Sequence, residues 1–171
     1  VAGMQRRGRC DWSQIRDVRN AVKIPVIGNG DVQTAQDVLR MLDETSCDMV
    51  MVGRAMLARP WILSQVGQAI GFEGESLVPQ GLSDGDFALW EGAEYGRNLM
   101  EFIDFWAERS DFGLGTKKVQ FFIRMSHMYL EWGHTLVSVA SRAKDYSELR
   151  TAVARFFESP QRMLTRTDLR M

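Results

Sequence analysis

Two short apolar segments, each followed by a glycine turn and a helix start, constrain the fold of this chain most. Residues 24–27 read Ile-Pro-Val-Ile and run into Gly-Asn-Gly-Asp at 28–31, and residues 49–52 read Met-Val-Met-Val and run into Gly-Arg at 53–54. Apolar runs of this length predict buried strands, and strands that alternate with helices at this spacing are typically parallel. The first part of the chain therefore indicates an α/β fold.

Helix signals surround both strands. Thr34 and Asp37 have the spacing of a capping box. Asp11 is suited to cap a helix that lies before the first strand, and another helix is expected to begin at Ala55. Two strands cannot cover their own edges, and a complete eight-stranded barrel needs about 250 residues. We therefore expect residues 1–72 to form the last β/α units of a TIM barrel, and the chain to be the C-terminal portion of a longer protein.

The second part of the chain carries helical signals alone. Apolar residues recur at helical spacing from Asp86 onward, and Asp145 with Glu148 predicts another capping box. Residues 73–85 are rich in glycine and polar residues, as is typical of a linker. The expected fold class is α/β, with the last β/α units of a TIM barrel, a linker at 73–85, and an all-α helical domain at 86–171.

Composition and charge exclude several classes of protein. With 45% hydrophobic and 25% charged residues the chain is globular, and its apolar runs are shorter than the roughly 20 residues of a membrane span. We expect no membrane contact and a cytoplasmic location. Cys10 and Cys47 lack the spacing of a zinc site or a disulfide framework, so no metal site is expected.

The net charge of −1 conceals an uneven distribution. Residues 73–111 contain ten acidic and two basic side chains, whereas residues 116–171 contain ten basic and five acidic ones. A basic segment of this kind suits a polyanion, although a solvated helical face explains it equally well. The acidic segment has no functional interpretation beyond a solvated helix.

The two glycine turns are candidate ligand sites. In parallel β/α folds, ligands bind at the carboxyl ends of the strands, and both turns occupy that position. Gly53 permits close approach of a ligand to the backbone, Arg54 offers a charged fork, and Asn29 and Asp31 offer hydrogen-bonding groups. The pair of turns indicates a phosphate-bearing ligand, while each turn alone is also explained as a structural connection.

A more specific resemblance rests on "IPVIGNGDV" and "DMVMVGRAMLARPWIL". These segments resemble the late barrel region of tRNA-dihydrouridine synthases, from about residue 10 to residue 63. The resemblance implies an FMN-dependent oxidoreductase that uses NADPH to reduce uridine to 5,6-dihydrouridine in tRNA. It also implies that the cofactor contacts residues of both turns, which are Asn29, Gly30, Asp31, Gly53 and Arg54.

The resemblance also implies what this chain lacks. The catalytic cysteine of the family lies in an earlier strand, and neither Cys10 nor Cys47 matches its motif. Ala2 stands where the family has a histidine that contacts the flavin. We therefore expect no catalytic residue in this chain, little activity of the chain alone, and pairing with the missing N-terminal half of the barrel.

The helical domain is expected to bind tRNA in this interpretation. On a predicted helix from about 117 to 131, basic side chains share a face opposite the apolar one, and others follow further along. Arg59 is ambiguous between helix packing and RNA contact. The RNA-binding candidates are Lys117, Arg124, His127, Arg142, Lys144 and Arg150.

Two alternatives of other classes stay open. One is another FMN-dependent barrel oxidoreductase that acts on a small metabolite, for which a basic helical domain has no evident purpose. The other is a non-catalytic RNA-binding module attached to a vestigial half-barrel. Flavin reduction that is indifferent to RNA would favour the first, and RNA binding without flavin the second.

Overall fold

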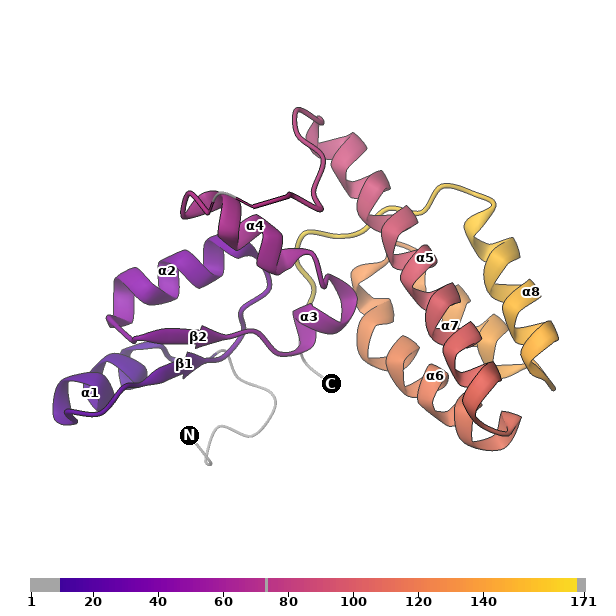
Figure 1. The fold of residues 1–171 in the computed structure, drawn as a ribbon, viewed down its shortest axis with the longest axis horizontal. Helices are drawn as coiled ribbons and strands as arrows, with labels where there is room; N and C mark the ends of the chain where they lie inside the picture. The colour runs from indigo at the N-terminus through magenta and orange to yellow at the C-terminus, as the bar shows by residue number, and fades with distance from the viewer. Residues whose placement is uncertain (1–9, 73, 169–171) are drawn as a thin grey trace. The chain divides into compact units, whose positions relative to one another are not determined.

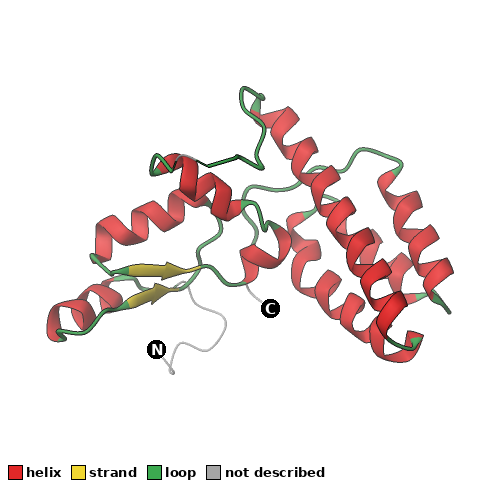
Figure 2. Cartoon of the chain, in the orientation of Figure 1, coloured by secondary structure: helices red, strands yellow, loops and turns green. Residues whose placement is uncertain are grey.

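The computed structural model describes residues 10–72 and 74–168, and these residues form two compact units (Figure 1). The β/α unit contains residues 10–56 and 60–79, apart from residue 73, together with residue 168. The helical unit contains residues 57–59 and 80–167. Figure 2 shows that strands occur in the first unit, whereas helices dominate the second.

The β/α unit alternates helices and strands. Its strands pair in parallel, with Ile27 opposite Met49 and Asn29 opposite Met51, which confirms the predicted parallel pairing. The capping box of Thr34 and Asp37 is also confirmed, because each side chain accepts a hydrogen bond from the other residue's backbone N–H. The elements are α1 (Ser13–Ala21), β1 (Ile27–Asn29), α2 (Ala35–Thr45), β2 (Met49–Met51), α3 (Arg54–Ala58) and α4 (Ile62–Ala69). The last two residues of α3 belong to the helical unit.

One face of the two-stranded sheet is packed, and the other is bare. Gly28 is buried on the packed face, where an added Cβ would lie 2.7 Å from Met41 Sδ and 2.8 Å from Cys47 Sγ. Ile27, Met49 and Met51 alternate to the opposite face, where each is half exposed or more. The strands were predicted to be buried, and this face departs from that prediction because no element of the described residues covers it.

Two predicted boundaries in this unit are wrong. The first strand covers Ile27–Asn29 rather than residues 24–27, because the backbone enters the ladder only after Pro25, which has no N–H to donate. The helix predicted to continue from Ala55 is divided into α3 and α4, and Pro60 lies in the interruption. The first shift makes Gly28 and Asn29 part of the strand itself.

The helical unit is built around one long helix. Its core contains fully buried apolar side chains such as Leu99, Ile123 and Leu149. Burial raises the pKa of the Tyr95 phenol, and its hydroxyl lies 2.7 Å from Ser126 Oγ. The elements are α5 (Asp84–Arg109), α6 (Phe112–Ser126), the 3₁₀ turn η1 (His127–Tyr129), α7 (Gly133–Ser141) and α8 (Tyr146–Phe157).

Arg59 belongs to this unit and is 3% exposed. Its Nε lies 3.1 Å from Glu91 Oε1, its guanidinium donates to the carbonyl oxygens of Leu164 and Thr165, and it lies over the Tyr129 ring. Desolvation lowers the pKa of Arg59, and Glu91 opposes this shift. Of its two predicted interpretations, the structure therefore favours packing over RNA contact.

Two predictions in the helical unit need correction. The helix predicted over residues 117–131 ends at Ser126, because the chain turns through η1 so that Leu130 can pair with Met163 in an isolated bridge. Asp145 caps α8 as predicted, but the Glu148 carboxylate accepts from the N–H of Lys144 rather than that of Asp145. None of the helices within the described residues combines the length and apolar character needed to cross a bilayer.

Candidate functional site

The two glycine turns lie next to each other at one end of the sheet. β1 ends at Asn29 and β2 ends at Met51, and these two residues face each other in the parallel register. Residues 30–31 and 53–54 therefore follow the carboxyl ends of two neighbouring strands. This is the carboxyl edge of the sheet, where ligands of parallel β/α folds bind.

The first turn has an unusual backbone conformation. Gly30 has a φ of 138° and Asp31 has a φ of 51°, which places two successive residues in the region that favours glycine. An added Cβ on Gly30 would overlap the Cys10 side chain, whose Cβ would lie 2.8 Å away. Gly30 is thus required both by its backbone angle and by the close approach of Cys10.

The segment Cys10–Trp12 holds this turn by hydrogen bonds. The Cys10 N–H donates to Asp31 Oδ2 over 2.7 Å, and the Trp12 indole N–H donates to the Gly30 carbonyl over 2.9 Å. The Arg40 guanidinium lies 4.7 Å from the centre of the Trp12 ring. No sequence spacing indicates the two hydrogen bonds, which join residues 18 and 21 positions apart.

Asp31 and Arg54 join the two turns. Arg54 Nη2 lies 3.5 Å from Asp31 Oδ1, and the two side chains are 35% and 30% exposed. Asp31 therefore accepts from Cys10 with one carboxylate oxygen and contacts Arg54 with the other. The structure thus brings Asp31 and Arg54 of the predicted ligand site together. The Asp31 carboxylate faces the Cys10 N–H and the Arg54 guanidinium.

Gly53 and Asn29 leave room for a ligand. An added Cβ on Gly53 would meet nothing within 4 Å among the described residues, so packing does not explain the glycine. The Asn29 residue is exposed, and its side-chain amide has no hydrogen-bond partner in the described part of the chain. An open backbone, an available amide and a guanidinium form a donor set that suits a phosphate-bearing ligand.

Neither cysteine has the features of an activated thiol. Burial raises the pKa of the Cys10 thiol, with further contributions from the carboxylates of Asp31 and Asp11, and Cys47 is buried. The expectation that neither residue is the catalytic cysteine stays a prediction. Ala2 and the rest of residues 1–9 lie outside the described residues.

The basic candidates of the helical unit differ in their partners. Arg150 donates to both carboxylate oxygens of Asp104, over 2.8 Å and 3.2 Å, and this pairing raises the pKa of Arg150. The His127 ring Nδ1 lies 3.1 Å from the Ile123 carbonyl and 3.0 Å from the Arg124 carbonyl. The candidates that are exposed and have no side-chain partner within the described residues are Lys117, Arg124, Arg142 and Lys144.

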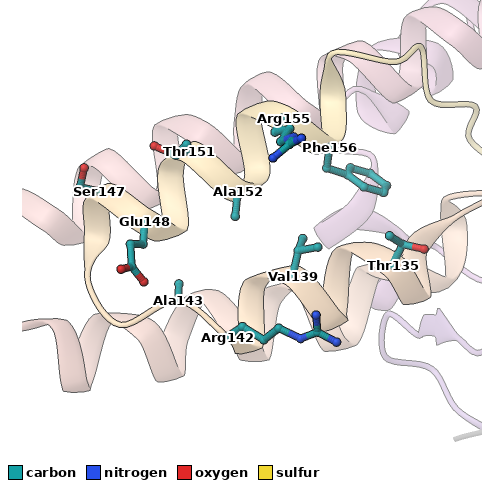
Figure 3. A pocket seen from close by; sticks show the side chains of 10 residues that line it. All are labelled: Thr135, Val139, Arg142, Ala143, Ser147, Glu148, Thr151, Ala152, Arg155 and Phe156. Carbon is teal, nitrogen blue, oxygen red and sulfur yellow. The ribbon is translucent and has the colours of Figure 1, made fainter.

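A groove of about 620 Å³ lies between α7 and α8 (Figure 3). Arg142 lines it from the C-cap of α7, and Arg155 and Phe156 line it from α8. The sequence predicted Arg142 as an RNA-binding candidate. It did not predict the groove, because a hollow between two helices has no sequence signature. Among the described residues, no three His, Cys, Asp or Glu side chains are grouped as a metal site.

Comparisons with known proteins point to one family. Residues 2–80 match the family model described as dihydrouridine synthase. The chain is 45% identical over 58 residues to a "Probable tRNA-dihydrouridine synthase" of Aquifex aeolicus, covering 34% of this chain and 18% of that protein. It is 29% identical over 152 residues to "tRNA-dihydrouridine synthase B" of Pectobacterium carotovorum, covering 89% of this chain and 44% of that protein. The chain thus spans less than half the length of these relatives.

Proposed function

The chain belongs to the dihydrouridine synthase family, and from that premise we propose that it is part of an FMN-dependent tRNA-dihydrouridine synthase. The observation that carries this proposal is the pair of neighbouring turns joined by Asp31 and Arg54. We propose that residues 1–72 form the last β/α units of a TIM barrel and hold FMN. Residues 73–85 are then a linker, and residues 86–171 a helical domain that binds tRNA.

The residues present fit a flavin nucleotide. Arg54 supplies positive charge to the phosphate, and the open side of Gly53 lets the phosphate approach the backbone. Asn29 offers its free amide to polar groups of the cofactor. Asp31 has both oxygens engaged by Cys10 and Arg54, so its role is to orient Arg54. Bound FMN would supply the hydride chemistry by which NADPH reduces a uridine in tRNA.

Activity requires more than the described residues. Two strands cannot close a barrel, and Ile27, Met49 and Met51 present an apolar face with no cover. Burial raises the pKa of the Cys10 thiol, and Cys47 is buried, whereas a reactive thiol has a lowered pKa and an exposed position. We propose that further barrel strands, supplied by a longer form of this chain or by another chain, complete the site.

We propose that the helical unit contacts tRNA phosphates through the basic side chains that have no acidic partner. Lys117 and Arg124 on α6 and Lys144 before α8 are exposed and offer charge that a polyanion can neutralise. His127 and Arg142 are further candidates, whereas the Arg150 guanidinium is already paired with Asp104. A uridine inside folded tRNA must leave its stack to be reduced, so binding of the surrounding backbone is needed.

FMN binding by the 171-residue chain tests this function first. Titration with quenching of flavin fluorescence should give saturable binding if the two turns form a partial site. Binding that responds to tRNA in the longer protein would distinguish a tRNA enzyme from a reductase of a small metabolite. A folded chain that binds tRNA but no flavin would instead support the alternative of an RNA-binding module.

Substituting Gly53 by alanine is expected to weaken FMN binding about tenfold while leaving the fold intact. The added methyl group has room in the structure, since nothing lies within 4 Å of it, but it occupies the space through which the phosphate would approach. Thermal unfolding and FMN titration of the same sample separate the two effects. The expected tenfold change corresponds to about 1.4 kcal/mol of binding free energy. Equal FMN affinity of the variant and the parent chain would show that Gly53 does not contact the cofactor.

Charge reversal on α6 and on α8 is expected to have unequal effects on tRNA binding. Arg124→Glu should weaken binding and reduce the slope of log affinity against log salt by roughly 1, because one phosphate contact is lost. Arg150→Glu is the matched control, since Arg150 is paired with Asp104. Filter binding over a range of salt concentrations measures both. Equal slopes for Arg124→Glu and the parent chain would identify this face as merely solvated.

A further inference from the structure

The groove between α7 and α8 combines an apolar floor with cationic walls. Figure 3 shows Val139 on α7 and Ala143 just after it directed toward α8, and Ala152 and Phe156 directed from α8 toward α7. These four side chains are partly exposed. Arg142 and Arg155 line the same hollow. The floor therefore suits a flat apolar surface, and the walls suit an anion.

The two arginines are available for a ligand. Neither guanidinium has an ion-pair or hydrogen-bond partner within the described residues, and both side chains are exposed. Arg150, which belongs to the same helix as Arg155, is held by Asp104 instead. Glu148 is the acidic residue of the groove lining, and its carboxylate accepts from the Lys144 N–H over 2.9 Å. Positive charge thus predominates in the lining.

The shape of the groove selects among polyanions. Axes of packed helices lie about 8–10 Å apart, so a hollow between two of them accepts one strand and excludes a duplex. Single-stranded RNA offers alternating phosphates and flat bases, which match guanidinium groups beside an apolar floor. A run of acidic residues would match the arginines but offers no flat apolar surface to Ala152 and Phe156.

We propose that this groove binds an unstacked nucleotide of a single-stranded RNA segment. Arg142 and Arg155 contact the flanking phosphates, and the base lies against Ala143, Ala152 and Phe156. This inference rests on the proposed tRNA function. It extends that function by assigning an unpaired region of the RNA to the groove between α7 and α8. The phosphate contacts supply affinity, and the floor supplies preference for an exposed base.

Two kinds of variant test the groove with the 171-residue chain and a short single-stranded oligouridylate. Arg142→Gln with Arg155→Gln should lower the slope of log affinity against log salt by about 1.4, since each single-strand phosphate contributes about 0.7. Ala152→Leu should weaken binding about tenfold at unchanged slope, because the added carbons occupy the place of one base. The matched controls are Arg150→Gln, whose side chain is paired, and Ala154→Leu, which is exposed on α8 outside the groove lining.

The outcomes separate this inference from the function on which it rests. If tRNA binds and Arg124→Glu weakens it, but the groove variants behave as their controls do, the tRNA proposal stands and the groove assignment fails. If no RNA binds to the folded chain, both fail. Duplex RNA that binds as tightly as the single strand, with the same sensitivity to Ala152→Leu, would also overturn the assignment. Circular dichroism of each variant verifies that the helix content of the chain is retained.

Discussion

Replacing Arg54 by alanine should weaken FMN binding by about 1.5–3 kcal/mol, the usual contribution of a hydrogen bond to a charged group. Arg54 begins α3 beside the open backbone of Gly53, and its guanidinium is held 3.5 Å from Asp31. Loss of the only charged side chain proposed to contact the phosphate should therefore reduce FMN affinity about tenfold or more. Fluorescence titration of the chain measures the effect.

Matched variants show whether this loss is specific. Arg16→Ala on α1 removes the same charge from an exposed residue outside the two turns, and should leave FMN affinity unchanged. Arg54→Lys should restore part of the affinity, because lysine keeps the charge but lacks the planar fork. The folded state itself should be little affected, since a partly exposed ion pair contributes at most about 1 kcal/mol. Unchanged FMN affinity of Arg54→Ala would contradict the proposed site.

Gly92→Ala should lower the free energy of unfolding of the helical unit by about 2–3 kcal/mol. Gly92 lies on α5, where an added Cβ would overlap the backbone carbonyl of Gln161. The tail cannot easily move away, because the Met163 N–H donates to the Ala88 carbonyl over 3.0 Å. Urea unfolding followed by circular dichroism at 222 nm measures the change, since most of the helix is in this unit.

Gly85→Ala is the matched control on the same helix. Its added Cβ would lie 3.5 Å from Arg162 Nη1, an ordinary contact, and alanine stabilises a helix by up to about 1 kcal/mol relative to glycine. We therefore expect the two substitutions to change stability in opposite directions. A stabilised Gly92→Ala variant would show that the tail does not pack against α5.

Local features of this fold could be predicted from the sequence, because neighbouring residues determine them. Thr34 and Asp37 lie three positions apart, so their capping box is visible in the sequence and is confirmed. The parallel pairing of the strands also follows from the spacing of strand, helix and strand. The end of α6 at Ser126 could not be predicted, because the turn that follows depends on the pairing of Leu130 with Met163.

The candidate site could be predicted from the sequence only in part. The residue types at Gly53 and Arg54 indicate a phosphate site, but nothing local shows that Asp31 contacts Arg54 or that Trp12 donates to the Gly30 carbonyl. These contacts join residues 18 to 23 positions apart. The pairing of Arg150 with Asp104 crosses 46 positions, so charge counting could not distinguish Arg150 from Arg142.

The bare face of the two-stranded sheet affects how the two units respond to local opening. The buried cluster against which the sheet packs comprises Val32, Val38, Met41 and Cys47, whereas the helical unit buries large side chains from all its helices. Segments with few buried contacts open at lower free energy and exchange their amide hydrogens sooner. Amide hydrogens of β1 and β2 in this chain should therefore exchange before those of α5. Further barrel strands that cover Ile27, Met49 and Met51 should slow the exchange of the β1 and β2 amides.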